Sequence, residues 1–279
     1  MTVAFATRLL PARPDLAAEH LRGQVRAERF AAGELRRVRV PLLNLTATAD
    51  ADAERATQLV CGEAFTAYEE RPDGWTWGQA GSDGYVGYVR SEGLGSGAGA
   101  GARSRVTAPW SLVYQRPHAR ARAVSELPCL AEVPVAGTTG GFARLRGGGF
   151  VPRAHLAPVE DWVGLAERLA GAPYLWGGRS ARGIDCSGLV QVALLAAGRS
   201  APRDSDMQAA LLGEALPARG RLRRGDLVFW KGHVGIMRDA ETLLHANAHH
   251  MAVASEPLAA AEARVAATGG GAVLLRRRP

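Results

Sequence analysis

The sequence predicts an α+β protein made of two small β-barrels followed by a C-terminal α+β domain. Short strand-like runs separated by turn-forming residues occupy residues 31–95 and residues 105–158. From residue 159 onwards, runs with helical spacing come first and strand-like runs follow, which is the order expected of an α+β domain. The chain has 279 residues, which is long enough for several small domains.

The N-terminal part of the chain predicts an extension and then the first barrel. Residues 1–30 form the extension, in which Asp15 and Gly23 have the positions of a helix cap and a helix stop. In the first barrel, residues 31–95, two hairpin-type turns are centred on Pro72-Asp73-Gly74 and Ser82-Asp83-Gly84. The strand-like runs of this barrel are residues 35–45, 64–69, 75–79 and 85–89.

A linker separates the first barrel from the second. Residues 96–104 are rich in Gly, Ala and Ser, a composition typical of flexible linkers. Residues 105–158 return to the β pattern and predict a second barrel of similar size. Its strand-like runs are residues 111–114, 129–133, 141–145 and 150–151.

The C-terminal domain, residues 159–279, is predicted to contain two helices before its strands. The second of them, residues 187–197, ends at Gly198, a residue favoured just past a helix end. The first helix is residues 162–170, and the strand-like runs are 227–230, 234–237, 242–245, 251–254 and 272–275.

Cys186 has the sequence context of a nucleophile. It follows a glycine-rich loop and stands at the start of the predicted helix. The partial positive charge and the unpaired N–H groups of a helix N-terminus stabilise a thiolate and lower its pKa. The same N–H groups can hold the oxyanion of a tetrahedral intermediate.

Two histidines are placed to activate this thiol. His233 follows a turn and begins a predicted strand, and an imidazole there can accept the thiol proton and later protonate a leaving amine. A third polar group must orient that imidazole. His245 lies twelve positions further on, and a hairpin that pairs the two strands would bring both rings side by side.

Five motifs resemble the NlpC family of cell-wall cysteine peptidases, over residues 159–275. They are Tyr174-Leu175-Trp176-Gly177-Gly178, Asp185 to Val190, Pro202 to Ser205 with Gln208, Arg224 to Leu227, and His233 to Ile236. The resemblance implies a papain-like fold for this domain. It implies a triad in which Cys186 is the nucleophile, His233 the base and His245 the orienting residue.

Two SH3-like barrels before such a domain resemble the γ-D-glutamyl-L-diamino acid endopeptidases of the dipeptidyl-peptidase VI type. That resemblance implies hydrolysis of the bond between γ-D-Glu and the diamino acid in murein tri- or tetrapeptides with a free N-terminal L-Ala. The positions that match the group's substrate-binding residues are Asp185, Ser187, Ser205, Glu63 and Tyr85. A buried ammonium needs a carboxylate and hydrogen-bond acceptors, which these residue types provide.

Simpler roles stand beside these assignments. Asp185 can act as the cap of the following helix, with or without a role in binding the amine, and Ser205 can cap the next helix. Tyr174 and Trp176 are interpreted as packing residues. No metal and no organic cofactor are expected: His245, His249 and His250 lack the His-Glu-x-x-His spacing of zinc peptidases.

The composition excludes several other classes. The net charge of +7 does not predict nucleic-acid binding, because the arginines are scattered and only a short basic run, residues 276–278, ends the sequence. Three widely spaced cysteines do not form a disulfide framework. Neither a signal peptide nor a long apolar run is visible, so no membrane insertion and a cytoplasmic location are expected.

The sequence therefore predicts a cysteine peptidase that acts on cell-wall peptides in their recycling. Two alternatives remain open: a non-catalytic wall-peptide-binding protein, and an amidase or transpeptidase on the same fold. The sequence gives no indication of the diamino acid at the cleaved bond or of the oligomeric state.

Overall fold

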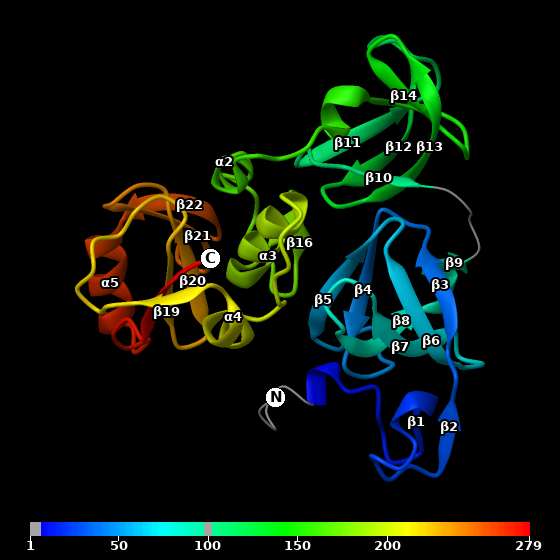
Figure 1. Ribbon diagram of the computed structural model, residues 1–279, viewed down its shortest axis with the longest axis horizontal. Coiled ribbons are helices and arrows are strands. Elements are labelled where there is room, and N and C mark those ends of the chain that lie inside the picture. Colours follow the sequence, from blue (N-terminus) through cyan, green and yellow to red (C-terminus); the bar gives the residue numbers. More distant parts are fainter. Residues whose placement is uncertain (1–6, 98–101) are drawn as a thin grey trace. The chain divides into compact units, whose positions relative to one another are not determined.

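The computed structural model describes residues 7–97 and 102–279, which fall into two compact units. The first unit contains residues up to 106 together with 110–156, and the second contains 107–109 together with 157–279 (Figure 1). Each unit has its own sheets and its own core, and each is described separately below.

In place of the helix predicted at residues 15–23, the first unit contains a short parallel strand pair. β1 (Leu16–Ala18) pairs with β2 (Arg29–Ala31), and only one 3-10 turn, Glu19–Leu21, lies between them. The helix prediction for residues 15–23 was therefore wrong. The side chains of Leu16, Ala17 and Ala18 are all buried, and this tertiary packing outweighs the local helix preference.

The first barrel is a seven-stranded antiparallel sheet with the order β5-β4-β8-β7-β6-β3-β9. Its core gathers apolar side chains from most of these strands, among them Leu45, Leu59, Phe65 and Val89. The strands are β3 (Glu34–Val38), β4 (Leu42–Thr46), β5 (Arg55–Val60), β6 (Ala64–Glu70), β7 (Trp75–Ala80), β8 (Val86–Arg90) and β9 (Leu94–Ser96).

The second barrel is a six-stranded antiparallel sheet with the order β10-β13-β14-β15-β11-β12. Of the predicted linker, residues 98–101 lie outside the described residues, and its two ends belong to β9 and β10. Of the predicted strand at 129–133, residues 129–131 form a turn in which Leu130 adopts φ +71°, and residues 132–133 begin β13. The strands are β10 (Arg103–Arg105), β11 (Trp110–Tyr114), β12 (Ala123–Pro128), β13 (Glu132–Thr139), β14 (Phe142–Leu145) and β15 (Phe150–Pro152).

The second unit is built on a six-stranded antiparallel sheet with the order β18-β23-β19-β20-β21-β22. Its strands are β18 (Glu214–Leu216), β19 (Leu227–Trp230), β20 (His233–Met237), β21 (Thr242–Asn247), β22 (Ala252–Pro257) and β23 (Leu275–Arg278). A separate two-stranded ribbon pairs β16 (Arg179–Ser180) with β17 (Gly183–Ile184).

Helices cover both faces of the large sheet in the second unit. α3 (Cys186–Ala196) packs against β20 and β21 from one side, and α5 (Leu258–Ala267) lies on the other side (Figure 1). The α5 side is filled by a cluster that includes Val228, Met237 and Leu243. Two shorter helices, α2 (Trp162–Glu167) and α4 (Ser205–Leu211), contact α3.

The basic run at the end of the sequence is an internal part of this sheet. β23 pairs with β18 on one side and with β19 on the other. The guanidinium of Arg278 donates two hydrogen bonds of 2.8 Å to the fully buried carboxylate of Asp226. Arg276 forms an ion pair with Glu262, and Arg277 donates to backbone carbonyls. The three arginines are therefore engaged within the domain.

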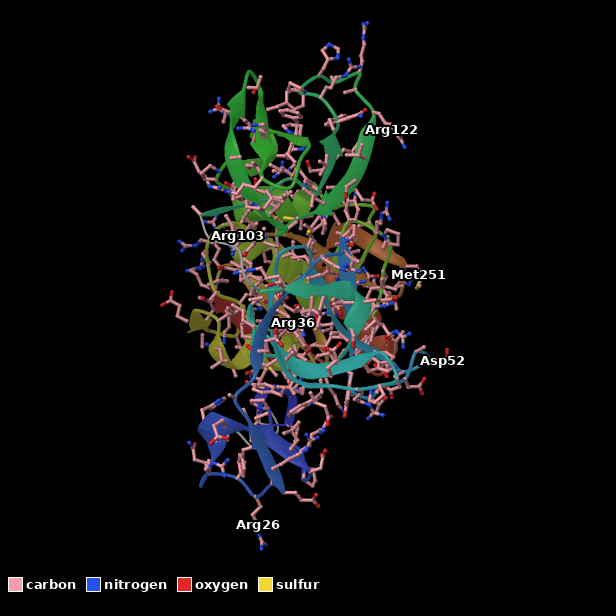
Figure 2. The ribbon with its side chains drawn as sticks, turned by 90° about the vertical axis from the view of Figure 1, so that its right-hand side faces the viewer. Arg26, Arg36, Asp52, Arg103, Arg122 and Met251 are labelled. Atoms are coloured by element: carbon pink, nitrogen blue, oxygen red, sulfur yellow. The ribbon has the colours of Figure 1, made fainter. Side chains whose placement is uncertain are left out.

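Other arginines are dispersed over the surface. Figure 2 shows Arg26, Arg36 and Arg122 on separate segments of the first unit. Arg36 forms ion pairs with Glu34 and Glu70, so part of the positive charge is compensated locally. Among the residues that the structure describes, no helix is long and apolar enough to cross a membrane.

Candidate functional site

Cys186 is the first residue of α3, one position earlier than the start predicted for the helix. Asp185 is the N-cap, and its Oδ1 accepts a 2.7 Å hydrogen bond from the N–H of Gly188. Its Oδ2 accepts a 2.8 Å bond from the N–H of Gly177 in the preceding glycine-rich loop. The cap therefore fixes both the helix start and the loop that leads to the thiol.

A buried ion pair between Arg203 and Asp185 stabilises this helix start. The guanidinium of Arg203 donates to both carboxylate oxygens of Asp185, at 3.0 and 2.6 Å, and to Ser187 Oγ at 3.0 Å. The two charged side chains are only 1% and 8% exposed. The motif around Arg203 was visible in the sequence, but its partner is eighteen positions away and only the fold identifies it.

The thiol of Cys186 is held neutral in the free protein. Burial raises its pKa to about 12, and the nearby carboxylate of Asp185 acts in the same direction. The N–H groups of Val234 and Ser187 point at the sulfur and lower the pKa by less. The sequence predicted a lowered pKa from the helix N-terminus. That direction was wrong, because desolvation outweighs the helix-end N–H groups.

His233 and His245 lie side by side on adjacent strands. A two-residue turn in which Gly232 has φ +70° joins β19 to β20 and places His233 at the first position of β20. Its Nε2 lies 2.8 Å from Nδ1 of His245, which is buried on β21. The N–H of Val234, the next residue after His233, points at the Cys186 sulfur. The three side chains therefore belong to one site.

The imidazole of His233 is also neutral. Burial lowers its pKa to about 3, and the neighbouring His245 contributes in the same direction. Burial likewise lowers the pKa of His245, against the opposite effect of Glu256. A neutral thiol and a neutral imidazole therefore share the site, so the thiol keeps its proton in the free protein at neutral pH.

This neutral pair predicts the pH dependence of thiol alkylation. Since the Cys186 pKa is about 12, the thiolate fraction is small at pH 7 and grows about tenfold per pH unit up to that value. We expect the rate of Cys186 alkylation by iodoacetamide to rise steadily from pH 7 to pH 10, measured by mass spectrometry of the peptide that contains residue 186. A rate that is already constant below pH 7 would show a preformed thiolate–imidazolium pair instead.

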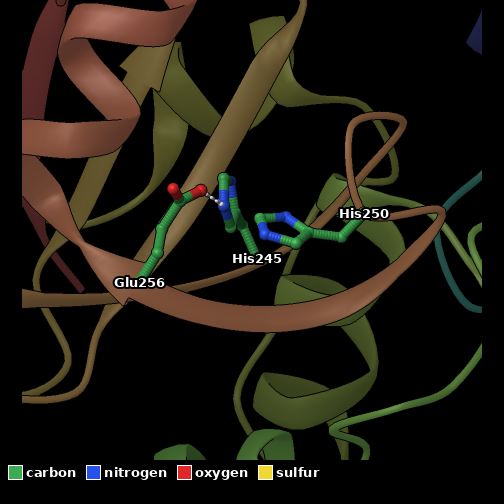
Figure 3. A group of neighbouring side chains, drawn as sticks. All are labelled: His245, His250 and Glu256. Carbon is green, nitrogen blue, oxygen red and sulfur yellow. Dashed lines mark hydrogen bonds and ion pairs between the residues drawn. The ribbon is translucent and has the colours of Figure 1, made fainter.

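The far side of His245 faces a carboxylate that the sequence did not identify. Glu256 Oε1 lies 2.7 Å from His245 Nε2, and the guanidinium of Arg264 binds both oxygens of Glu256 (Figure 3). The ion pair with Arg264 lowers the Glu256 pKa to about 2. The carboxylate is therefore ionised throughout the neutral pH range.

One group of side chains here has the ligand types of a metal site. Ligand atoms of His245, His250 and Glu256 all lie within 4.8 Å of one another (Figure 3). Each already has a hydrogen-bond partner: Glu256 binds Arg264 and His245, while His250 Nδ1 lies 3.0 Å from Asn247 Oδ1. A metal would have to displace these bonds, so we interpret the group as a hydrogen-bonded relay.

The predicted substrate-binding residues are divided between the two units. In the second unit, Ser187 contacts Arg203 and Asp185, and Ser205 is the first residue of α4, whose N-cap is Asp204. In the first unit, Glu63 accepts hydrogen bonds from the N–H of Val60 and from Ser82 Oγ, and Tyr85 is buried in the barrel core. Substrate binding by these residues stays a prediction.

The glycine-rich loop presents an aromatic side chain to solvent. Trp176 is 55% exposed, so its interpretation as a packing residue was wrong. Tyr174 is half-buried, and burial together with the nearby Cys186 and Asp185 raises the pKa of its phenol to about 12. The loop therefore places one exposed ring and one neutral phenol next to the residues that surround the thiol.

Comparison with known families identifies the domain that carries this site. Residues 171–265, which contain Cys186, His233, His245 and Glu256, match the NlpC/P60 family, and residues 45–94 match the bacterial dipeptidyl-peptidase SH3 domain. Residues 171–265 are an NlpC/P60 domain. Its presence behind an SH3 domain confirms the fold class and the family resemblance that were predicted from the sequence.

Curated relatives share the NlpC/P60 domain over part of their length. A γ-D-glutamyl-L-lysine dipeptidyl-peptidase of Bacillus subtilis is 34% identical over 43% of this chain and 46% of its own. A dipeptidyl-peptidase 6 of Lysinibacillus sphaericus is 37% identical over 32% of each chain. The chain thus spans less than half the length of these two relatives.

A solved structure shares most of the fold. An NlpC/P60 family protein from Bacillus cereus superposes with a TM-score of 0.71 over 88% of this chain and 99% of its own, at 18% identity. The likeness extends beyond the NlpC/P60 domain into the first unit, since that domain alone is much shorter than the superposed part.

Proposed function

We propose that the protein is a cysteine peptidase that hydrolyses the bond between γ-D-Glu and the diamino acid of peptidoglycan peptides. The observation that carries the proposal is the placement of Cys186 at a helix N-terminus beside His233, whose ring is held by His245 at 2.8 Å. A nucleophile, a base and an orienting group are the three parts that thiol-mediated acyl transfer requires.

In this mechanism the sulfur of Cys186 attacks the γ-carbonyl carbon of D-Glu while His233 accepts the thiol proton. Because Nε2 of His233 faces His245, its Nδ1 is the nitrogen available to the thiol. N–H groups at the start of α3 stabilise the oxyanion. His233 then protonates the leaving amine, a thioester forms on Cys186, and a water activated by His233 hydrolyses it.

The names of two relatives support the choice of bond. Both are called dipeptidyl-peptidases, and one name specifies the γ-D-glutamyl-L-lysine linkage. A dipeptidyl-peptidase must recognise a free N-terminus two residues before the cleaved bond, and we assign that recognition to the L-Ala ammonium. The negative charge of Asp185 is already compensated by Arg203. In binding the L-Ala ammonium, Asp185 therefore contributes hydrogen-bond acceptors more than uncompensated charge.

We further propose that the substrates are small wall fragments, tri- or tetrapeptides, that are degraded during recycling in the cytoplasm. A requirement for a free amine would exclude peptides still linked to glycan through that end. None of the described cysteines, Cys61, Cys129 and Cys186, forms a disulfide, which suits a reducing compartment.

The test is product analysis by mass spectrometry with L-Ala-γ-D-Glu-L-Lys, the corresponding diaminopimelate peptide and an N-acetylated copy of each. We expect release of the dipeptide L-Ala-D-Glu from the free peptides only. Equal cleavage of the acetylated copies would keep the peptidase and reject the amine requirement.

The same assay separates the alternative functions. A new amide formed with an added amine acceptor would identify a transpeptidase. Binding of the peptides without any product would identify a binding protein.

A further inference from the structure

A line of hydrogen bonds continues beyond His245 on three adjacent strands. His233 is on β20, His245 on β21 and Glu256 on β22. His245 is 1% exposed, and both of its ring nitrogens are engaged: Nδ1 with His233 Nε2 at 2.8 Å and Nε2 with Glu256 Oε1 at 2.7 Å. Arg264 on α5 binds the other end of this line, at the carboxylate.

The chemistry of the carboxylate determines where each ring carries its hydrogen. An ionised carboxylate only accepts hydrogen bonds, so Nε2 of His245 must carry hydrogen. In the neutral ring Nδ1 then has a free lone pair and accepts a hydrogen bond from Nε2 of His233. Neutral His233 is left with an unprotonated Nδ1, which is the form that can accept a proton from a thiol.

We propose that Glu256 is a positioning residue that fixes the tautomers of both histidines and so makes His233 a base toward Cys186. The proposal rests on the function proposed above for Cys186 and His233. Glu256 acts only through His245 and touches neither the thiol nor the cleaved bond.

The arginine explains why this carboxylate keeps its role over a wide pH range. Both guanidinium nitrogens of Arg264 bind Glu256, and this ion pair holds the carboxylate ionised. Without the carboxylate, the positive charge of Arg264, which already acts on His245, would remain near this ring. A guanidinium only donates, so it favours the opposite tautomer, in which Nδ1 of His233 carries the hydrogen and cannot act as a base.

The key variant is Glu256→Met, which keeps the length of the side chain and removes both acceptors. We expect kcat to fall by about 10²-fold or more with KM nearly unchanged, because a wrong tautomer removes the base without affecting binding. The matched control on the same helix as Arg264 is Glu262→Met, which removes a carboxylate paired with Arg276 and should leave kcat unchanged.

Arg264→Met separates a positioning role from a structural one. This variant breaks the ion pair between Arg264 and Glu256 but leaves the hydrogen bond between Glu256 and His245. We therefore expect kcat to fall by less than about fivefold at pH 8. Equal losses in Arg264→Met and Glu256→Met would mean that Glu256 only stabilises the fold, and would overturn the proposal.

Arg264→Met also predicts a pH shift. Arg264 depresses the Glu256 pKa, so its removal raises that pKa and moves the acid limb of the kcat profile to higher pH. The other titratable groups that act on this line, namely His233, His245, His250 and Asp185, keep their side chains in the variant, and loss of the Arg264 charge also raises the pKa of His233 and His245. An acid limb that does not move would contradict the proposal even if Glu256→Met fails to fold.

The tautomers can be observed without any substrate. In ¹⁵N-labelled Cys186→Ala protein, long-range ¹H–¹⁵N correlation spectra distinguish a protonated from an unprotonated ring nitrogen. We expect hydrogen on Nε2 of both histidines when Glu256 is present and on Nδ1 of His245 in the Glu256→Met background. Unchanged tautomers would overturn the proposal, whereas inactivity of the wild-type protein toward all wall peptides would count only against the proposed function.

Discussion

Replacing Cys186 by alanine is expected to lower kcat for hydrolysis of the wall tripeptide by about 10⁶-fold, because no other group can form the thioester. The change is small and the side chain is buried at the start of α3, so the fold should persist. The measurement is release of L-Ala-D-Glu over time, followed by mass spectrometry with the reduced protein.

Cys129→Ala is the matched control for this loss. Cys129 is also a buried cysteine outside any disulfide, but it lies in the first unit. We expect its replacement to leave kcat within about twofold. Hydrolysis by Cys186→Ala at the wild-type rate would reject the nucleophile, and equal losses in both variants would point to damage by cysteine replacement in general.

Replacing Arg203 by methionine is expected to destabilise the second unit by about 3–5 kcal/mol, because it leaves the buried carboxylate of Asp185 without its counter-charge. The α3 helix is capped by that carboxylate, so the loss should be largest there. Hydrogen exchange of peptides covering residues 186–196, measured in the full-length protein, reports the free energy of opening of this helix.

Arg224→Met provides the comparison for Arg203. Arg224 also pairs with carboxylates, Asp161 and Glu167, but its side chain is 39% exposed, and such pairs contribute about 0–1 kcal/mol. The double variant Asp185→Asn with Arg203→Met should recover part of the loss, since no buried charge remains. Similar losses of unfolding free energy in Arg203→Met and Arg224→Met would contradict the expectation that the buried ion pair contributes more than the exposed one.

The elements with strong local signals were predictable from the sequence. An acidic cap before Cys186 and a glycine after the helix define α3 to within a residue. The hairpin geometry that brings His233 to His245 followed from their spacing and from the turn before β20. These features depend on local sequence preferences that act over a few residues, and the family resemblance identified the same positions.

The errors arose where distant contacts decide the structure. Residues 15–23 look helical, yet pairing with β2 makes part of them a strand. β5 was missed because its polar residues, such as Thr57 and Gln58, are buried by their neighbours and hide the apolar pattern. At Leu130 a left-handed backbone ends what looks like a continuous strand.

The supporting residues of the site were invisible for the same reason. Arg203 meets Asp185 across the interior of the domain, and Glu256 meets His245 across two paired strands. The partners are 18 and 11 positions apart, which is further than a short motif reaches. The groups that carry the chemistry can be read from motifs, whereas the groups that hold them in position require the fold.

The place of β23 in the sheet has a consequence for how the protein is made. Because residues 275–278 lie between β18 and β19 and neutralise the buried Asp226, the sheet of the second unit is incomplete until they have emerged from the ribosome. The first unit contains none of these residues and can fold earlier in translation. The sheet that carries His233 and His245 can therefore close only after residues 275–278 have been synthesised.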